Sequence, residues 1–321
     1  MAPEFQISAT PLRPALKNSE DDATPPPLVP LCVEPASIPI DRRHAGELAW
    51  PSVPRWLTIA GMTETPPTQP QSPEVWLPPT EACWDLPAGE VHLWRATLDV
   101  SATQLTALSA TLGDDEPERA ARRIFERDRN HFVAARGTLR MLLGRYLQRE
   151  PASLSFEYGS HGKPSLRAAP NAATTTIEFN VAHSHGLALI ALARDRTVGV
   201  DLERVRGEVR CDALAGRCYS PAELRYYESL SDDLRRQHFF AAWARKESLL
   251  KATGRGLSLA MRDVEVADSS GSAAGILKLA DTSGVPKNWR WQAVEPGDGY
   301  TGAIAAEDGP WQLHRWQWPD A

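Results

Sequence analysis

The sequence predicts an α+β fold, in which antiparallel sheets carry helices on their faces and an irregular, proline-rich arm forms the N-terminus. The stretch 114–150 repeats apolar residues at spacings of three and four, as a helix with one buried face does, and 220–253 carries the start and stop signals of two further helices. Short stretches between and after them alternate apolar and polar residues, which indicates strands. The first 90 residues hold 18 of the 27 prolines, too many for a regular hydrogen-bonded element.

The composition is that of an ordinary globular protein, with 321 residues, 42% hydrophobic, 24% charged and a formal net charge of −6. This charge argues against bulk nucleic-acid binding, which needs a basic surface. No apolar run approaches the roughly 18 residues that span a membrane, and the N-terminus lacks the features of a secretory signal. The four cysteines form no CxxC pair, so we expect a protein of the reducing cytoplasm.

The N-terminal arm is expected to cover residues 1–88, with the folded part beginning near Gly89. Proline removes backbone donors and biases the preceding residue toward extended conformations, so no helix or long strand is expected there. Aromatic side chains argue against plain disorder, and the arm contains Trp50, Trp56, Trp76 and Trp84. We therefore expect part of the arm to pack on the domain behind it.

The region from Asp114 to Glu150 is expected to be helical, with Asp115 and Glu118 as a capping-box-like start. Its apolar stripe consists of Ile124, Phe125, Phe132, Leu139, Leu142, Leu143 and Tyr146. The same stretch carries nine arginines, including Arg119. Most of them are expected to form a solvated face, and a minority are candidates for holding phosphate, which suits the planar guanidinium group.

The remaining elements are short. Strands are expected at 91–95, 153–158, 176–181, 187–194, 264–267, 275–279, 289–294, 301–306 and 311–318. Ser220, Pro221 and Glu223 mark a helix start as N-cap, first-turn proline and capping-box partner. A second helix is expected from about Ser231 to Thr253, where Gly254 ends it.

The hexapeptide from Val198 to Glu203, VGVDLE, is the stretch around which these elements are organised. Side chains alternate along a strand, so its three apolar residues face a core and Gly199, Asp201 and Glu203 face the other way. The two carboxylates are then about 7 Å apart on one face, beside a glycine that leaves room for a ligand. Such a pair suits Mg²⁺, which proteins hold with one or two carboxylates plus substrate phosphates. A wet edge strand would have the same pattern.

Three further groups have both a functional and a structural interpretation. On the second helix Trp243, Glu247 and Lys251 share a face, so Glu247 is a candidate third metal carboxylate and Lys251 a phosphate partner, or the two form a surface pair. Lys163, in the turn 159–164, is suited to meet a phosphate or a base, although a plain turn is common. His183 and His185, between two strands, are candidates for metal, anion or loop contacts.

Taken together, three blocks resemble the signature of the 4′-phosphopantetheinyl transferases of the larger, surfactin-synthetase-activating type. They are FNVAHS at 179–184, VGVDLE at 198–203 and FAAWARKESLLKATGRGL at 240–257. Their order and spacing also fit, and Gly162-Lys163-Pro164 and the arginine-rich helix look like upstream blocks of that family. The resemblance covers about 91–317 and leaves out the arm.

The resemblance implies a pseudo-dimer of two similar α+β halves, 89–175 and 176–321, with coenzyme A between them and the metal site on the second half. Asp201, Glu203 and Glu247 match the Mg²⁺ ligands, and Lys251 matches the lysine on the pyrophosphate. His183 and Arg119 match contacts to the 3′-phosphate, and Lys163 and Pro164 match the adenine-side turn. The family commonly has a serine where Ala182 stands, which puts one polar contact in question.

The implied activity is transfer of the phosphopantetheine arm of coenzyme A to a serine of an apo acyl or peptidyl carrier protein, releasing 3′,5′-ADP. Glu247, Lys251 and Asp201 are the expected catalytic residues, in a monomeric cytoplasmic enzyme of fatty-acid, polyketide or nonribosomal-peptide synthesis. Three alternatives remain: a non-catalytic coenzyme A binder, another Mg²⁺-dependent phosphotransferase or nuclease, and a nucleic-acid module built on the arginines.

Overall fold

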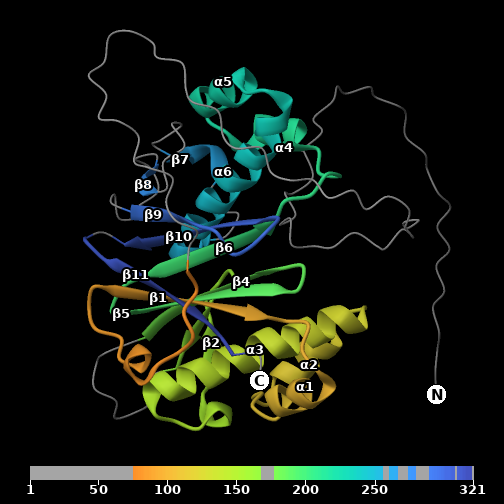
Figure 1. The fold of residues 1–321 in the computed structure, drawn as a ribbon, viewed down its shortest axis with the longest axis vertical. Coiled ribbons are helices and arrows are strands. Elements are labelled where there is room, and N and C mark those ends of the chain that lie inside the picture. The colour runs from red at the N-terminus through yellow and green to blue at the C-terminus, as the bar shows by residue number, and fades with distance from the viewer. Residues whose placement is uncertain are drawn as a thin grey trace, which may run out of the picture. The chain divides into compact units, whose positions relative to one another are not determined.

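The computed structural model describes residues 75–167, 177–255, 260–266, 274–279, 289–307 and 309–319 (Figure 1). One four-stranded sheet has the order β11 (Gln312–Gln317), β1 (Glu90–Thr97), β5 (Leu187–Arg194), β4 (Ile177–Ser184). A five-stranded sheet has the order β6 (Val198–Arg204), β10 (Tyr300–Glu307), β9 (Trp289–Val294), β8 (Ala274–Leu279), β7 (Val264–Val266). A small hairpin pairs β2 (Phe156–Tyr158) with β3 (Pro164–Leu166). The named strands pair antiparallel except β1 and β11, which run parallel.

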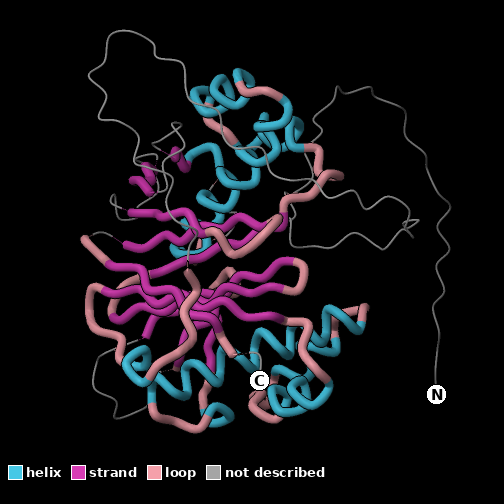
Figure 2. Tube along the Cα trace, in the orientation of Figure 1, coloured by secondary structure: helices cyan, strands magenta, loops and turns pink. Residues whose placement is uncertain are grey.

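Six α-helices lie in the described residues: α1 (Ala102–Ser109), α2 (Glu116–Ala121), α3 (Glu126–Leu147), α4 (Cys211–Cys218), α5 (Pro221–Ser229) and α6 (Asp232–Thr253). Figures 1 and 2 show four layers, with α3 under the four-stranded sheet and α6 over the five-stranded one. This arrangement confirms the predicted α+β fold with two similar halves, each a sheet with a long helix on its outer face. The four-stranded sheet with α1–α3 is called the N-terminal half below, although β4, β5 and β11 follow residue 176, and the five-stranded sheet with α4–α6 is called the C-terminal half. None of the described helices is long and apolar enough to cross a membrane.

The inner faces of the two sheets form the main core. Val91, Leu93 and Ala191 of the first sheet are fully buried against Val200 and Ile304 of the second. A second core lies between α3 and the first sheet, and includes Leu139, Leu142, Leu143, Trp94, Ile190 and Leu192. Because burial of apolar surface is the main stabilising contribution to folding, the long helices and the sheets are held in fixed layers.

The two halves meet along β4 and β6, each an edge strand of its own sheet. The side-chain Oδ1 of Asn180 accepts a hydrogen bond from the Val200 amide at 2.9 Å, and Ser184 Oγ accepts one from the Arg204 amide at 3.2 Å. Side chains of β4 therefore pair the edge amides that β6 leaves unpaired, and they fix the register between the sheets.

The region 114–150 differs from the prediction, because it forms two helices rather than one. The backbone of Phe125 is extended, with φ −88° and ψ 140°, so the chain turns between α2 and α3. Ile124 and Phe125 are 86% and 47% exposed and do not belong to the apolar stripe. Asp115 makes no capping hydrogen bond. The capping box at Ser220 and the stop at Gly254 are as predicted.

Three elements escaped the sequence prediction: α1, α4 and β3. Helix α1 begins with a capping box between Ser101 and Gln104, a signal that was readable in the sequence. Residues 151–153, at the start of the expected strand 153–158, form a 3₁₀ turn instead.

The described end of the N-terminal arm packs on the folded domain, while residues 1–74, with Trp50 and Trp56, lie outside the described residues. The Trp76 indole donates to the Glu295 carbonyl at 3.1 Å, and the Trp84 ring stacks on Trp94 at 5.1 Å between centroids. Trp84 thereby joins the core under α3.

Gly199 is where the helix α6 comes closest to β6. A Cβ atom placed on Gly199 would overlap the Ser248 carbonyl oxygen and the Ala252 amide nitrogen. The space beside this glycine is therefore filled by the helix backbone and not by a ligand, which corrects the expectation from the sequence. The apolar residues of β6 face the other sheet, so Asp201 and Glu203 face α6 as the alternation predicts.

We predict that Gly199→Ala separates β6 from α6 and lowers the free energy of unfolding by about 1–3 kcal/mol or more, the usual cost of overpacking a core. Chemical denaturation of both proteins measures this loss. Gly216→Ala is the matched control, because a Cβ at Gly216 meets nothing within 4 Å on α4. Equal stabilities of the two variants would contradict the close packing at Gly199.

Candidate active site

The site consists of acidic side chains from β6 and an acidic and a basic side chain from α6. Asp201 and Glu203 are 1% and 2% exposed. Glu247 and Lys251 lie one turn apart on α6 and share a face. Lys251 Nζ donates to Asp201 Oδ1 at 2.5 Å, whereas Asp201 Oδ2 is buried and has no hydrogen-bond partner among the described residues.

The electrostatics of this site show that its carboxylates repel one another. Burial, followed by the negative charge of Asp201, raises the pKa of Glu203 well above its ordinary range. Burial and the same neighbouring charge also raise the pKa of Glu247. The ammonium of Lys251 opposes both effects without cancelling them. Ionising all three carboxyl groups in this site is therefore unfavourable unless a further cation compensates their charge.

A divalent cation fits the chemistry of these donors. Carboxylate oxygens are the ligands that Mg²⁺ prefers, and an orphaned buried oxygen such as Asp201 Oδ2 is costly unless something pairs with it. In the described part of the chain, however, no group of three or more His, Cys, Asp or Glu side chains is arranged as a metal site. Lys251, bound to Asp201, occupies one of the candidate ligand oxygens.

His183 lies at the end of β4, beside the acidic site. Crowding by protein atoms, followed by the positive charges of Lys251 and Arg123, lowers the pKa of His183. The His183 residue is nevertheless exposed at the protein surface. Ala182 next to it is buried in the core between the sheets, where its side chain meets apolar neighbours.

A group of arginines from α2 and α3 lies on the N-terminal half. The guanidinium carbon of Arg119 lies 3.9 Å above the Tyr158 ring centroid, and Arg123 packs on Phe132. The Tyr158 hydroxyl and Arg136 Nη1 are buried without hydrogen-bond partners in the described structure. Unpaired buried donors next to cations suit an anionic ligand.

Arg123 was not singled out by the sequence, although it was among the nine arginines. Its charge contributes to the low pKa of His183, which places it near the acidic site. Helical spacing could not distinguish it from solvated arginines, because Arg123 lies outside both helices, in the turn between α2 and α3.

Lys163 and Pro164 lie at the β2–β3 hairpin, close to the start of β6. Lys163 Nζ donates to the Ala252 carbonyl at 2.8 Å and to the Val198 carbonyl at 3.3 Å. The structure thus brings together five of the predicted site residues: Asp201, Glu203, Glu247, Lys251 and His183. It places Lys163 at Val198, the first residue of β6.

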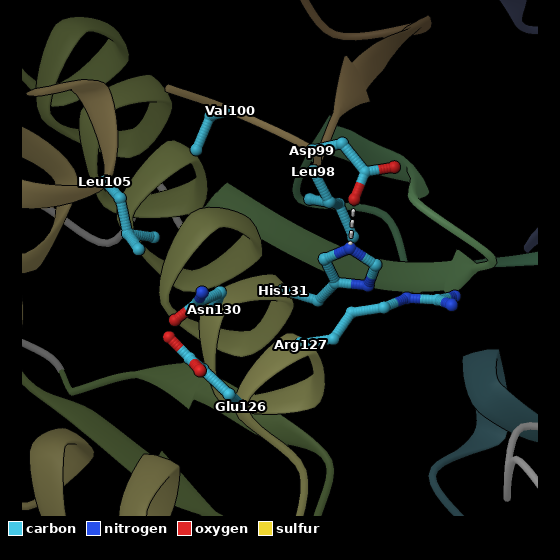
Figure 3. A pocket seen from close by; sticks show the side chains of 8 residues that line it. All are labelled: Leu98, Asp99, Val100, Leu105, Glu126, Arg127, Asn130 and His131. Carbon is cyan, nitrogen blue, oxygen red and sulfur yellow. Dashed lines mark hydrogen bonds and ion pairs between the residues drawn. The ribbon is translucent and has the colours of Figure 1, made fainter. Parts of the chain in front are cut away.

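A cavity of about 310 Å³ lies on the N-terminal half and is separate from the carboxylates (Figure 3). Its lining residues are Leu98, Asp99, Val100, Leu105, Glu126, Arg127, Asn130 and His131. His131 Nε2 and Asp99 Oδ1 are 2.7 Å apart across one side of it. Asp201, Glu203, Glu247 and Lys251 do not line this cavity.

A two-half α+β fold with a carboxylate cluster and flanking cations is an arrangement that suits a phosphorylated ligand. Comparison with known families agrees: residues 197–305 match the 4′-phosphopantetheinyl transferase superfamily, and 94–195 match the N-terminal part of 4′-phosphopantetheinyl transferases. The chain belongs to this family, which confirms the resemblance, and it is a 4′-phosphopantetheinyl transferase that acts on carrier proteins.

Similar proteins include 4′-phosphopantetheinyl transferases of other organisms. The 4′-phosphopantetheinyl transferase HetI of Nostoc sp. strain PCC 7120 is 38% identical over 229 residues, 71% of this chain and 92% of that protein. The transferase Sfp of Bacillus subtilis strain 168 is 26% identical over 152 residues, 47% of this chain and 64% of that protein. Among solved structures, the holo-[acyl-carrier-protein] synthase of Thermotoga maritima is 24% identical. The match covers 35% of this chain and 64% of that one, with a TM-score of 0.30.

We predict that Glu203→Gln gains stability over the wild type as pH rises from about 5 to about 8 in the presence of a chelator. The unfolded wild type ionises near its ordinary pKa of about 4.3, while folded Glu203 keeps its proton to higher pH. The wild type therefore loses stability across this window, and the variant lacks the effect.

Thermal midpoints at the two pH values test this, with the exposed Glu228→Gln as control. A midpoint difference between Glu203→Gln and wild type that does not change with pH would contradict the burial of a repelled carboxylate.

Proposed function

We propose that this transferase holds Mg²⁺ through Asp201, Glu203 and Glu247. We also propose that it binds coenzyme A along the seam between its halves, the line on which β4 and β6 meet. The observation that carries the metal proposal is the unpaired, buried Asp201 Oδ2 beside Glu203 and Glu247, whose pKa values are raised by burial and then by the charge of Asp201. When bound there, the cation supplies charge neutralisation for the pyrophosphate. Lys251 would then share its ammonium between Asp201 and a phosphate.

The cations along the seam support the placement of coenzyme A. Lys251 lies opposite Asp201 and suits the pyrophosphate. His183, with Arg123 near it, and Arg119 on Tyr158 suit the 3′-phosphate. The turn that carries Lys163 and Pro164 suits the adenine.

In the proposed reaction a carrier-protein serine attacks the phosphorus that bears the pantetheine arm. Glu247 accepts the serine proton, directly or through a water that it orients. The bond to 3′,5′-ADP breaks, and Lys251 stabilises the negative charge that develops on this leaving group. The serine oxygen becomes the phosphodiester oxygen, so one bond forms as one breaks.

The partners that we propose are acyl or peptidyl carrier domains of fatty-acid or secondary metabolism, served by a monomer in the cytoplasm. The two halves in one chain support the monomer, because they form both sides of the seam. The described cysteines Cys83, Cys211 and Cys218 are free thiols, which suits a reducing compartment. A non-catalytic coenzyme A binder and a different phosphotransferase predict no transfer of the arm.

We predict that Asp201→Ala and Glu247→Ala each lower transfer by on the order of a thousandfold, the factor that corresponds to several kcal/mol of lost charge stabilisation. Glu203→Ala should be milder if water replaces its oxygen. The assay incubates apo carrier protein, coenzyme A and Mg²⁺ and follows the mass gain of the carrier by the phosphopantetheine arm. Unchanged circular dichroism controls for folding, and near-wild-type turnover by either variant would end the metal assignment.

We predict that His183→Ala raises the KM for coenzyme A by about tenfold or more, because a charge-assisted hydrogen bond contributes roughly 1.5–3 kcal/mol. The KM for 3′-dephospho-coenzyme A should change little, since the proposed contact is to the 3′-phosphate. Steady-state kinetics with both substrates make the comparison. An equal loss on both would show that His183 serves another purpose, such as holding its loop.

A further inference from the structure

The side chain of Lys163 connects the hairpin of the N-terminal half to both elements of the acidic site. Its ammonium donates to the carbonyl of Ala252 on α6 at 2.8 Å and to that of Val198 on β6 at 3.3 Å. Ala252 directly follows Lys251, and Val198 is the first residue of the strand that carries Asp201. One cation thus holds the end of the helix against the start of the strand.

The last turn of α6 shows why this contact is needed. The Leu250 carbonyl accepts from Thr253 Oγ1 at 3.0 Å, and the Lys251 carbonyl accepts from the Gly254 amide at 3.3 Å. The Ala252 carbonyl accepts instead from Lys163, which lies 89 residues earlier in the chain. The final carbonyls of a helix need such partners, and a cation is favourable at this end.

Two further observations show that Lys163 is built into this position. Gly254 has φ +65°, and a Cβ placed on it would lie 3.4 Å from Lys163 Cδ, so the lysine stem runs along the helix end. Burial lowers the pKa of Lys163, and the carboxylate of Glu178 opposes this change. Placing an ammonium where desolvation disfavours its charge is costly, and the two carbonyls compensate for it.

We propose that Lys163 is a positioning residue, which fixes the end of α6 against the start of β6 and so holds Lys251 and Glu247 opposite Asp201. This inference rests on the proposed function of that site. The turn that carries Lys163 is also the proposed adenine-side turn, so the same hairpin that meets the coenzyme sets the geometry of the catalytic groups. A shift of about 1 Å in such groups can cost on the order of a hundredfold in rate.

The test uses Lys163→Met, which keeps the stem and removes the donors, and Lys163→Arg, which keeps the cation. We expect kcat at saturating coenzyme A to fall about tenfold or more in Lys163→Met, with less than about a threefold change in the Kd for coenzyme A measured by calorimetry. Lys163→Arg should recover most of the rate. Ser160→Ala, on the exposed part of the same turn, is the matched control and should behave as wild type.

Two outcomes would overturn the proposal. A raised Kd with kcat unchanged at saturation would show a direct contact between Lys163 and the coenzyme. A lowered thermal midpoint with neither kinetic change would show that Lys163 only stabilises the fold.

Hydrogen exchange of the amides in 250–255 separates this inference from the proposed function. Faster exchange in Lys163→Met supports the contact with α6 even if the wild type transfers no arm, and unchanged exchange contradicts it.

Discussion

The close approach of α6 to β6 at Gly199 is the constraint on which the rest of the site depends. Because this position lacks a Cβ, the helix backbone lies directly against the strand. Asp201 and Glu203 lie two and four residues after Gly199, so their side chains leave β6 on the same face. They meet the side chains of α6 there, and the Lys251 ammonium donates to Asp201. If α6 lay further from β6, water would solvate each carboxylate separately. The packing of one glycine thus produces the charge density that the chemistry uses.

This charge density comes at the expense of stability. Asp201 and Glu203 are nearly fully buried. In the described structure one oxygen of Asp201 accepts a hydrogen bond from the ammonium of Lys251, and the other has no hydrogen-bond partner. Buried carboxylates without a matching cation disfavour folding. The layers around the site compensate: both faces of β6 are covered, by the apolar core on one side and by α6 on the other. Active sites commonly retain groups that a structure without function would replace.

The sequence predicted the parts of this arrangement that depend on local periodicity. The alternation in VGVDLE correctly separated the core side chains of β6 from Asp201 and Glu203, and the spacing of Glu247 and Lys251 put them on one face of α6. It could not show that α6 fills the space at Gly199, since a ligand and a helix backbone both require a glycine there. Helical spacing continued through Ile124 and Phe125 by coincidence, and the contact between Lys163 and Ala252 joins residues that no local pattern relates.

The distribution of charge explains how a chain with a net charge of −6 can receive a polyanion. The N-terminal half presents arginines of α2, of α3 and of the turn between them, where Arg123 lies; its positive charge contributes to the low pKa of His183. The C-terminal half presents the carboxylates of β6 and α6. Under the proposal above, a ligand with several phosphates would meet cations directly on one side of the seam and would need the proposed metal ion on the other. Asn180 and Ser184 hold these two surfaces in register through the β6 backbone. In the proposed binding mode, the seam would thus provide two kinds of phosphate environment, one made by side chains of the protein and one that depends on the proposed metal. The N-terminal half would then hold the coenzyme, and the C-terminal half would activate its pyrophosphate.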